Sequence, residues 1–71
     1  MLRKETIQVW ENPSEWVATT RLLVWKRIEP SGALYGYIRS GYGPVIFSLE
    51  DDSVAHTFRS FGHMYNDGWR L

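Results

Sequence analysis

The stretch LYGYIRSGYGPVIF, residues 34–47, decides how this chain folds. It interleaves tyrosines and aliphatic residues with glycines, a proline and an arginine. Aromatic and β-branched residues favour strands and glycine and proline favour turns, so the stretch predicts a strand, a tight turn and a second strand. The same residue types also build surfaces on which nucleic-acid bases stack. The sequence therefore leaves open whether the stretch packs inside the protein or binds a partner.

The preceding residues extend this hairpin into a meander. TRLLVWKRI (residues 20–28) predicts another strand, and EPSGA (residues 29–33) predicts the connecting turn, with residues 30–32 as a three-residue loop. PVIFSLE (residues 44–50) supplies the third strand. We therefore expect a three-stranded antiparallel meander without internal repeats.

The N-terminal part of the chain predicts a strand followed by a short helix. KETIQVW (residues 4–10) alternates polar and apolar side chains with a period of two, which is typical of a strand. In ENPSEW (residues 11–16), Asn12 suits a helix cap and Pro13 suits the first helical position. The β-branched residues that follow favour only one or two helical turns.

The C-terminal part predicts a helix and a short last strand. In DDSVAHTFRSFG (residues 51–62), Val54, Phe58 and Phe61 have helical spacing. HMYNDGWRL (residues 63–71) contains a turn signal and then strand-forming residues. The fold class is thus α+β: a three-stranded antiparallel meander backed by one C-terminal helix, with an N-terminal strand and a short helix.

The expected turns set a register that sorts the side chains onto two faces. The first turn places Val24 opposite Ile38, and the second places Phe47 across Gly36, where it fills the gap that glycine leaves. One face is then uniformly apolar, and we expect the C-terminal helix to cover it. Its residues are Leu22, Val24, Ile28, Leu34, Ile38, Val45, Phe47 and Leu49.

The opposite face is richer in aromatic residues than a solvated sheet face normally is. It carries Leu23, Trp25, Arg27, Tyr35, Tyr37, Arg39 and Ile46. Three covers are possible: the N-terminal segment with Trp10, Trp16 and Val17, a second protein chain, or a nucleic acid. If a partner binds this face, the residues expected to contact it are Trp25, Arg27, Tyr35, Tyr37 and Arg39.

Composition narrows the class of protein. Seventy-one residues predict one small domain, residues 1–71, and the absence of cysteine removes thiolate metal clusters and cysteine nucleophiles. A formal net charge of zero disfavours tight binding of a phosphate backbone. Because no apolar run reaches the about 20 residues of a bilayer span, we expect a cytoplasmic chain that binds no membrane.

Catalytic and metal-binding chemistry has weak support. On the expected C-terminal helix, Asp52, His56 and Arg59 share a face, and His63 follows it. We interpret these residues as a solvated helix face and the acidic run at residues 50–52 as a helix cap, because a third well-spaced metal ligand and a positioned nucleophile are both missing. We expect no cofactor, no metal and no enzymatic activity.

The functional hypothesis is a non-enzymatic protein–protein interaction module. Its size suits a small inhibitor or accessory subunit, of the kind that phages or mobile elements encode. The partner is expected to be a larger protein or a second copy of the chain, docked on the aromatic and arginine-bearing sheet face. The alternative is a single-stranded nucleic-acid-binding domain that uses the same face.

Overall fold

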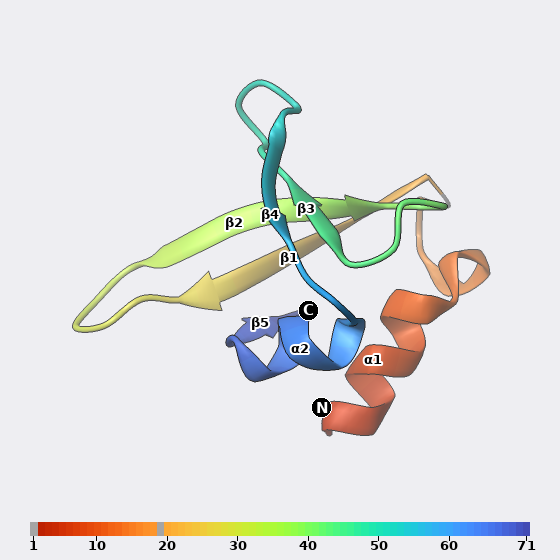
Figure 1. The fold of residues 1–71 in the computed structure, drawn as a ribbon, viewed down its shortest axis with the longest axis horizontal. Coiled ribbons are helices and arrows are strands. Elements are labelled where there is room, and N and C mark those ends of the chain that lie inside the picture. The colour runs from red at the N-terminus through yellow and green to blue at the C-terminus, as the bar shows by residue number, and fades with distance from the viewer. Residues whose placement is uncertain (1, 19) are drawn as a thin grey trace.

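The computed structural model describes residues 2–18 and 20–71. Over these residues the chain forms one antiparallel sheet with the strand order β4-β3-β2-β1-β5, and its helices lie on one side of that sheet (Figure 1). The strands are β1 (Arg21–Arg27), β2 (Ala33–Arg39), β3 (Val45–Phe47), β4 (Val54–Thr57) and β5 (Trp69–Arg70). The helices are α1 (Arg3–Glu11), the short 3-10 helix η1 (Pro13–Glu15) and α2 (Phe61–Asn66). The expected α+β class, with an antiparallel meander and a C-terminal helix, is confirmed.

The predicted N-terminal strand is wrong, because these residues form helix α1. Thr6 and Trp10, four residues apart, lie on the same face of that helix and are both buried. The Trp10 ring packs 6.0 Å from Phe61 and 6.2 Å from Tyr65, measured between ring centres. This packing against α2 overrides the weak strand preference of the segment, as tertiary contacts often do. The predicted short helix is present as η1.

The predicted C-terminal helix begins ten residues later than expected, because residues 54–57 form strand β4 instead. β4 pairs with β3, and its Val54 and Thr57 are β-branched residues that favour strands. Helix α2 starts after Ser60, whose hydroxyl accepts a hydrogen bond from the His63 backbone N–H at 3.1 Å. The acidic residues 50–52 therefore lie in the β3–β4 loop and cap no helix.

The pairing of β1 with β2 differs from the expected register by two residues. Val24 lies opposite Gly36, and Trp25 lies opposite Tyr35. The loop spans residues 28–32, closed by a hydrogen bond from Ile28 N to Gly32 O at 3.1 Å, so it is two residues longer than predicted. A shift of two residues leaves every side chain on its predicted face, because side chains alternate with a period of two.

The pairing of β2 with β3 differs from the expected register by one residue, which exchanges the faces of β3. Tyr37, and not Gly36, lies opposite Phe47. The prediction that Phe47 fills the gap at Gly36 is therefore wrong. Ile46 fills it: a Cβ atom built on Gly36 would lie 2.5 Å from Ile46 Cγ2 and 3.0 Å from the Phe47 carbonyl oxygen.

The core lies between the helices and the face of the sheet that they cover, which we call the inner face. Three strand residues of this face, Val24, Ile38 and Ile46, are fully buried. They pack with Trp10 of α1, Trp16 directly after η1, Met64 of α2 and Trp69 of β5. Predicted inner-face residues nearer the ends of the strands, Ile28, Leu34 and Leu49, are exposed.

The described helices are short. The longer of them, α1, has nine residues, and neither it nor α2 has the length and apolar character that a membrane span requires.

Candidate binding surface

The sheet face that points away from the helices, here called the outer face, carries all of the predicted partner-binding residues. They occupy alternate positions of the paired strands β1 and β2, so their side chains leave the sheet on the same side. These residues are Trp25, Arg27, Tyr35, Tyr37 and Arg39. The structure divides them into two groups that differ in burial.

The first group lies on the outer face toward the loop end of the β1–β2 hairpin and is exposed. Tyr35 is 68% exposed and Arg27 is exposed, and Leu23, which lies opposite the buried Tyr37 on the same face, is 64% exposed. Trp25 lies opposite Tyr35 and keeps 36% of its surface exposed, while its indole N–H donates to the Leu71 carbonyl oxygen at 2.7 Å. We call Leu23, Trp25, Arg27 and Tyr35 the hairpin patch.

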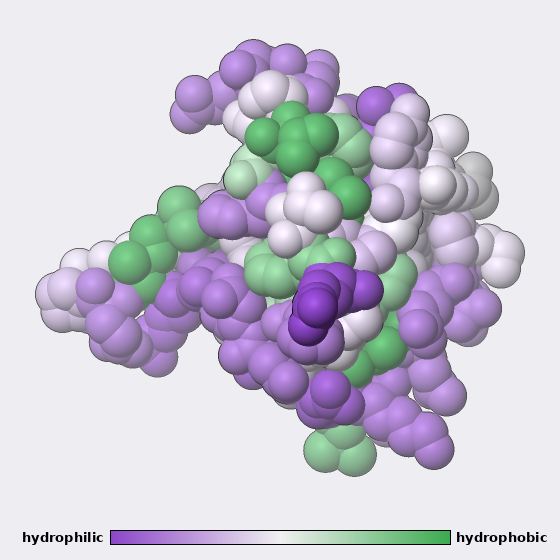
Figure 2. Space-filling view, viewed as in Figure 1, coloured by the Kyte–Doolittle hydropathy of each residue, from purple (hydrophilic) through white to green (hydrophobic). Residues whose placement is uncertain are grey.

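The loop end of the β1–β2 hairpin forms an arm that projects away from the helices (Figure 1), and Arg27 and Tyr35 lie near that end of the strands. Figure 2 shows hydrophobic residues at the surface of this projecting arm, next to hydrophilic ones. Ile28 and Leu34, at 38% and 42% exposure, add apolar surface close to the loop. The arm is thus an apolar surface mixed with charge, which is the composition of many protein-binding sites.

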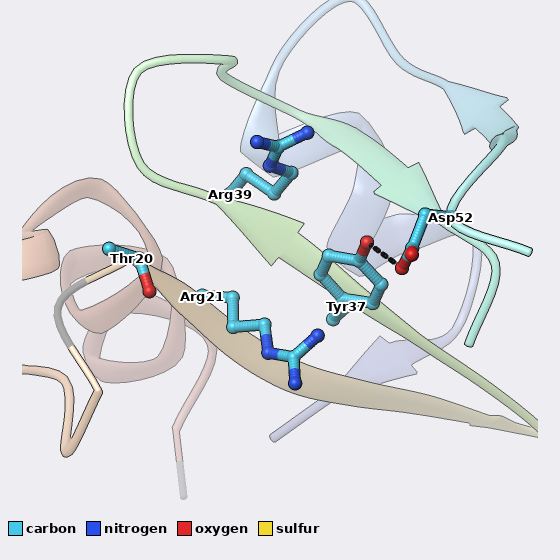
Figure 3. Close-up of a pocket in the computed structure, with 5 residues that line it drawn as sticks. All are labelled: Thr20, Arg21, Tyr37, Arg39 and Asp52. Carbon is cyan, nitrogen blue, oxygen red and sulfur yellow. Dashed lines mark hydrogen bonds between the residues drawn. The ribbon is translucent and has the colours of Figure 1, made fainter.

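At the other end of the same strands Arg39 is exposed, but Tyr37 is covered. Tyr37 is only 3% exposed and stacks on Phe47, with ring centres 5.6 Å apart. Its hydroxyl donates to the Asp52 carboxylate at 2.5 Å (Figure 3). Tyr37 is therefore a structural residue in this fold, almost entirely covered by the rest of the chain.

The segment that covers Tyr37 is not the N-terminal segment that the sequence suggests. Trp10 and Trp16 of the N-terminal segment lie in the core on the inner face, and Val17 is fully exposed. The interpretation that this segment covers the outer face is therefore wrong. Asp52 of the β3–β4 loop reaches Tyr37 instead and accepts a hydrogen bond from its hydroxyl.

The β3–β4 loop is fixed by its own hydrogen bonds. Ser48 N donates to Ser53 O at 2.8 Å, and Asp52 N donates to Ser48 O at 3.0 Å. Asp52 has a φ of 61°, a left-handed conformation that aspartate tolerates better than most residues. Hydrogen bonds from the Ser53 hydroxyl and backbone N–H lower the pKa of Asp51. The loop therefore presents an ordered carboxylate to Tyr37.

The environment of Tyr37 favours its neutral phenol. The hydrogen bond to Asp52 raises the pKa of Tyr37, and burial and the charge of Asp52 raise it further. The positive charges of Arg39 and Arg21 act in the opposite direction on the same pKa.

Two arginines stand beside this buried tyrosine. Arg21 and Arg39 lie directly opposite each other on β1 and β2. The Arg21 guanidinium carbon is 5.2 Å from the centre of the Tyr37 ring, and that of Arg39 is 4.7 Å from the Tyr42 ring and 5.3 Å from the Phe47 ring. At these distances the rings attract the cations and hold their orientation.

These arginines border a hollow of about 360 Å³. Figure 3 shows Arg21 and Arg39 on either side of the Tyr37 ring, with Asp52 beyond its hydroxyl. The lining residues are Thr20, Arg21, Tyr37, Arg39 and Asp52, and we call this hollow the arginine cleft. Of these, only Tyr37 and Arg39 are among the contact residues that the sequence predicts. The length of the β1–β2 loop decides which residue lies opposite Arg21. A predicted loop of five residues, in place of three, would have paired Arg21 with Arg39.

The residues considered for catalysis do not assemble. Asp52 lies in a loop that holds Tyr37, and His56 lies in β4, so the predicted helical pair of Asp52 and His56 is wrong. The His63 ring lies 2.7 Å from the Ser60 hydroxyl at the start of α2. In residues 2–18 and 20–71 no three histidine or acidic side chains are grouped so that they could hold a metal ion.

Comparisons with models of protein families, with curated proteins and with solved structures find no match for this chain.

Proposed function

We propose that this chain is a non-enzymatic protein-binding module that docks on a larger protein through the outer face of its sheet. The observation that carries this proposal is the hairpin patch, where Leu23 and Tyr35 stay exposed on a strand pair whose other face carries the core residues Val24 and Ile38. Large apolar and aromatic residues that stay in water on so small a domain mark an interaction site. Tyrosine, tryptophan and arginine are also the residues most enriched at binding hot spots.

The size of the domain fits one docked partner. A protein interface of ordinary size buries about 800 Å² on each side, which is about a sixth of the 4867 Å² surface of this chain. A domain with an exposed sheet face of this kind, in whose described residues no catalytic group assembles, suits the role of a small inhibitor or accessory subunit.

A test compares the hairpin patch with an exposed apolar residue elsewhere. Leu23→Ser/Tyr35→Ser removes the patch, and Leu2→Ser removes an exposed side chain at the start of α1. The tagged proteins are incubated with lysate of the encoding organism, and captured proteins are quantified by mass spectrometry. We expect the double variant to lose at least 90% of the specifically captured protein and the Leu2→Ser control to retain it. Equal capture by all three proteins would refute the proposal.

A second copy of the chain is the other protein partner to consider. Sedimentation of the purified protein at several concentrations decides between the two. A monomer at concentrations that saturate partner capture supports docking on a different protein. A dimer that Leu23→Ser/Tyr35→Ser dissociates would show that the patch is a self-association surface.

Single-stranded nucleic acid is a second candidate function, favoured by one observation. Tyr35 and Trp25 are neighbouring exposed aromatic residues beside Arg27, an arrangement on which bases stack. The net charge of zero and the acidic β3–β4 loop oppose it. Retention on a polynucleotide column that falls steeply with salt would favour this function over protein docking, because counterion release gives phosphate binding that dependence.

A further inference from the structure

Two hollows of different character meet at one arginine. The arginine cleft is polar, and beside it lies a second hollow of about 350 Å³ with a mainly apolar lining. Its lining residues are Val17, Ala18, Arg21, Leu22, Leu23 and Leu49, and we call it the apolar groove. Arg21 lines both hollows, so a ligand that fills them together must present an apolar group and a polar group side by side.

The arginine cleft has a net positive charge, because two arginines and one aspartate line it. Arg21 and Arg39 face each other across the strand pair, and like charges in that position destabilise a sheet. Among the described residues, neither guanidinium has a carboxylate within the 4.0 Å of an ion pair, whereas Lys26 and Arg27 both do. The nearby carboxylate of Asp52 accepts a hydrogen bond from the Tyr37 hydroxyl and pairs with neither arginine. A bound anion would relieve the repulsion between the two arginines.

The cleft is also built before any ligand arrives. The rings of Tyr37, Tyr42 and Phe47 hold the two guanidinium groups, and Phe47 is buried like Tyr37. Because the arginines are already oriented, binding an anion costs less side-chain entropy than it would with free arginines. Planar guanidinium groups match the geometry of carboxylate and phosphate oxygens.

The surroundings favour a single carboxylate over a chain of phosphates. Asp52 lines the cleft, and Glu50 and Asp51 are exposed on the same loop. A polyanion that passes through the cleft would approach these three acidic residues and be repelled. One carboxylate, carried by a side chain that enters between the arginines, avoids most of this repulsion.

We propose that the arginine cleft is a subsite for an aspartate or glutamate side chain of the protein partner, with an adjacent apolar side chain of the same segment in the apolar groove. This inference rests on the proposed function and names the chemistry of the segment that is recognised: an acidic residue next to a leucine-like residue. The partner's carboxylate accepts hydrogen bonds from Arg21 and Arg39. Leu23 joins the apolar groove to the hairpin patch, so the same docked partner covers both.

The test uses two dipeptide probes that differ only in charge. N-acetyl-Glu-Leu-amide and N-acetyl-Gln-Leu-amide are titrated separately into the isotope-labelled protein and followed by NMR. With the glutamate probe we expect saturable shifts of the Arg21 and Arg39 Nε–H signals and of the Leu23 and Leu49 methyl signals. The glutamine probe should bind at least tenfold more weakly. Equal binding of the two probes, or shifts that leave both arginines unaffected, would overturn the proposal.

Variants and a competitor sharpen the result. Arg21→Gln and Arg39→Gln should each weaken binding of the glutamate probe at least tenfold, while Arg59→Gln, an exposed arginine outside both hollows, should leave it unchanged. The probe comparison in the parent protein remains decisive if a variant fails to fold. Tighter binding of an oligothymidylate at the same signals would overturn the proposal in favour of a nucleic-acid ligand.

The outcome can be separated from that of the proposed function. If Leu23→Ser/Tyr35→Ser abolishes partner capture but Arg21→Gln and Arg39→Gln do not, the module docks as proposed and the carboxylate subsite is wrong. If the glutamate probe binds as expected but the double variant captures as much protein as the parent, the subsite stands and the proposed docking face is wrong.

Discussion

The two faces of the same three strands are buried by different means. On the inner face, aliphatic side chains such as Ile38 and Ile46 are sealed by helices, and their exposure falls to zero. On the outer face, Tyr37 and Phe47 are covered by arginine side chains and an acidic loop, and Tyr35 two residues away remains mostly exposed. The inner face is thus specified by packing, while the outer face combines a small polar cluster with surface left for a partner.

The largest expected loss of stability comes from a substitution in the core on the inner face. Ile46→Ala removes a fully buried side chain that fills the space above Gly36, and we expect it to lower the free energy of unfolding by about 2–5 kcal/mol. Urea unfolding of the variant measures this loss. Val54→Ala, at an exposed position of the neighbouring strand, is the control and should change stability by about 0.5 kcal/mol or less. Similar losses for both variants would contradict the assigned β3 register.

The next effect concerns the close approach of β2 and β3. Gly36→Ala would place a methyl group 2.5 Å from Ile46 Cγ2 and 3.0 Å from a backbone carbonyl, so the strands must move apart. We expect a loss of about 1–3 kcal/mol from overpacking. Thermal unfolding is the measurement, and Ser40→Ala, at an exposed position beyond the end of β2, is the control. A Gly36→Ala protein as stable as the parent would show that this contact is looser than described.

A smaller effect tests the cluster on the outer face. Tyr37→Phe keeps the ring stack and removes the hydrogen bond to Asp52, which should cost about 1.5 kcal/mol, as for a hydrogen bond to a charged group. The variant is compared with Tyr35→Phe, whose side chain is exposed and which should match the parent in urea unfolding.

The same tyrosine predicts a pH dependence at the alkaline end. Because the folded-state pKa of Tyr37 is raised, its contribution to stability is complete below the unfolded-state pKa, about 10, and is lost as pH rises through the folded-state pKa. The difference in unfolding free energy between the parent and Tyr37→Phe should therefore shrink above about pH 10. A difference that stays constant to higher pH would contradict the assigned hydrogen bond.

The smallest effect concerns the loop that supplies Asp52. Hydrogen bonds from Ser53 lower the folded-state pKa of Asp51, so this carboxylate adds stability above its unfolded-state pKa that is lost as pH falls through the folded-state pKa. Ser53→Ala should raise the pKa of Asp51 toward its ordinary value, measured by NMR titration of the carboxyl carbon. An unchanged titration would show that the Ser53 hydroxyl does not hold this loop.

The central hairpin could be predicted from sequence because its signals agree. Leu22 and Val24 alternate with Leu23 and Trp25, and glycine and proline mark the turns, so both the strands and the faces of β1 and β2 follow from local rules. The first turn was predicted two residues too short, and this error was harmless because an even shift preserves the faces. The second turn was predicted with a register that is wrong by one residue, and this error put Phe47 on the wrong face of the sheet.

Helix α1 and strand β4 could not be predicted because distant contacts decide them, whereas the predicted short last strand is present as β5. Residues 4–10 fit a period of two as well as a helical spacing, and only the packing of Trp10 on Phe61 and Tyr65 selects the helix. Residues 54–57 likewise form a strand because they pair with β3.

The arginine cleft could not be predicted for the same reason. Its parts are separated along the chain, and Asp52 reaches Tyr37 only through the β3–β4 loop. A sequence shows that arginine and tyrosine are present, but the register of the sheet determines that Arg21 and Arg39 meet.

The central claim is that the outer face is divided into a covered cluster and an open docking surface. Urea unfolding of Tyr37→Ala beside Tyr35→Ala tests it most directly, since the two residues lie on the same strand and face. We predict a loss of about 3–5 kcal/mol for Tyr37→Ala, as for a buried aromatic residue, and at most about 1 kcal/mol for Tyr35→Ala. Losses of several kcal/mol for both variants would mean that the whole outer face is a second core, and the division proposed for it would be wrong.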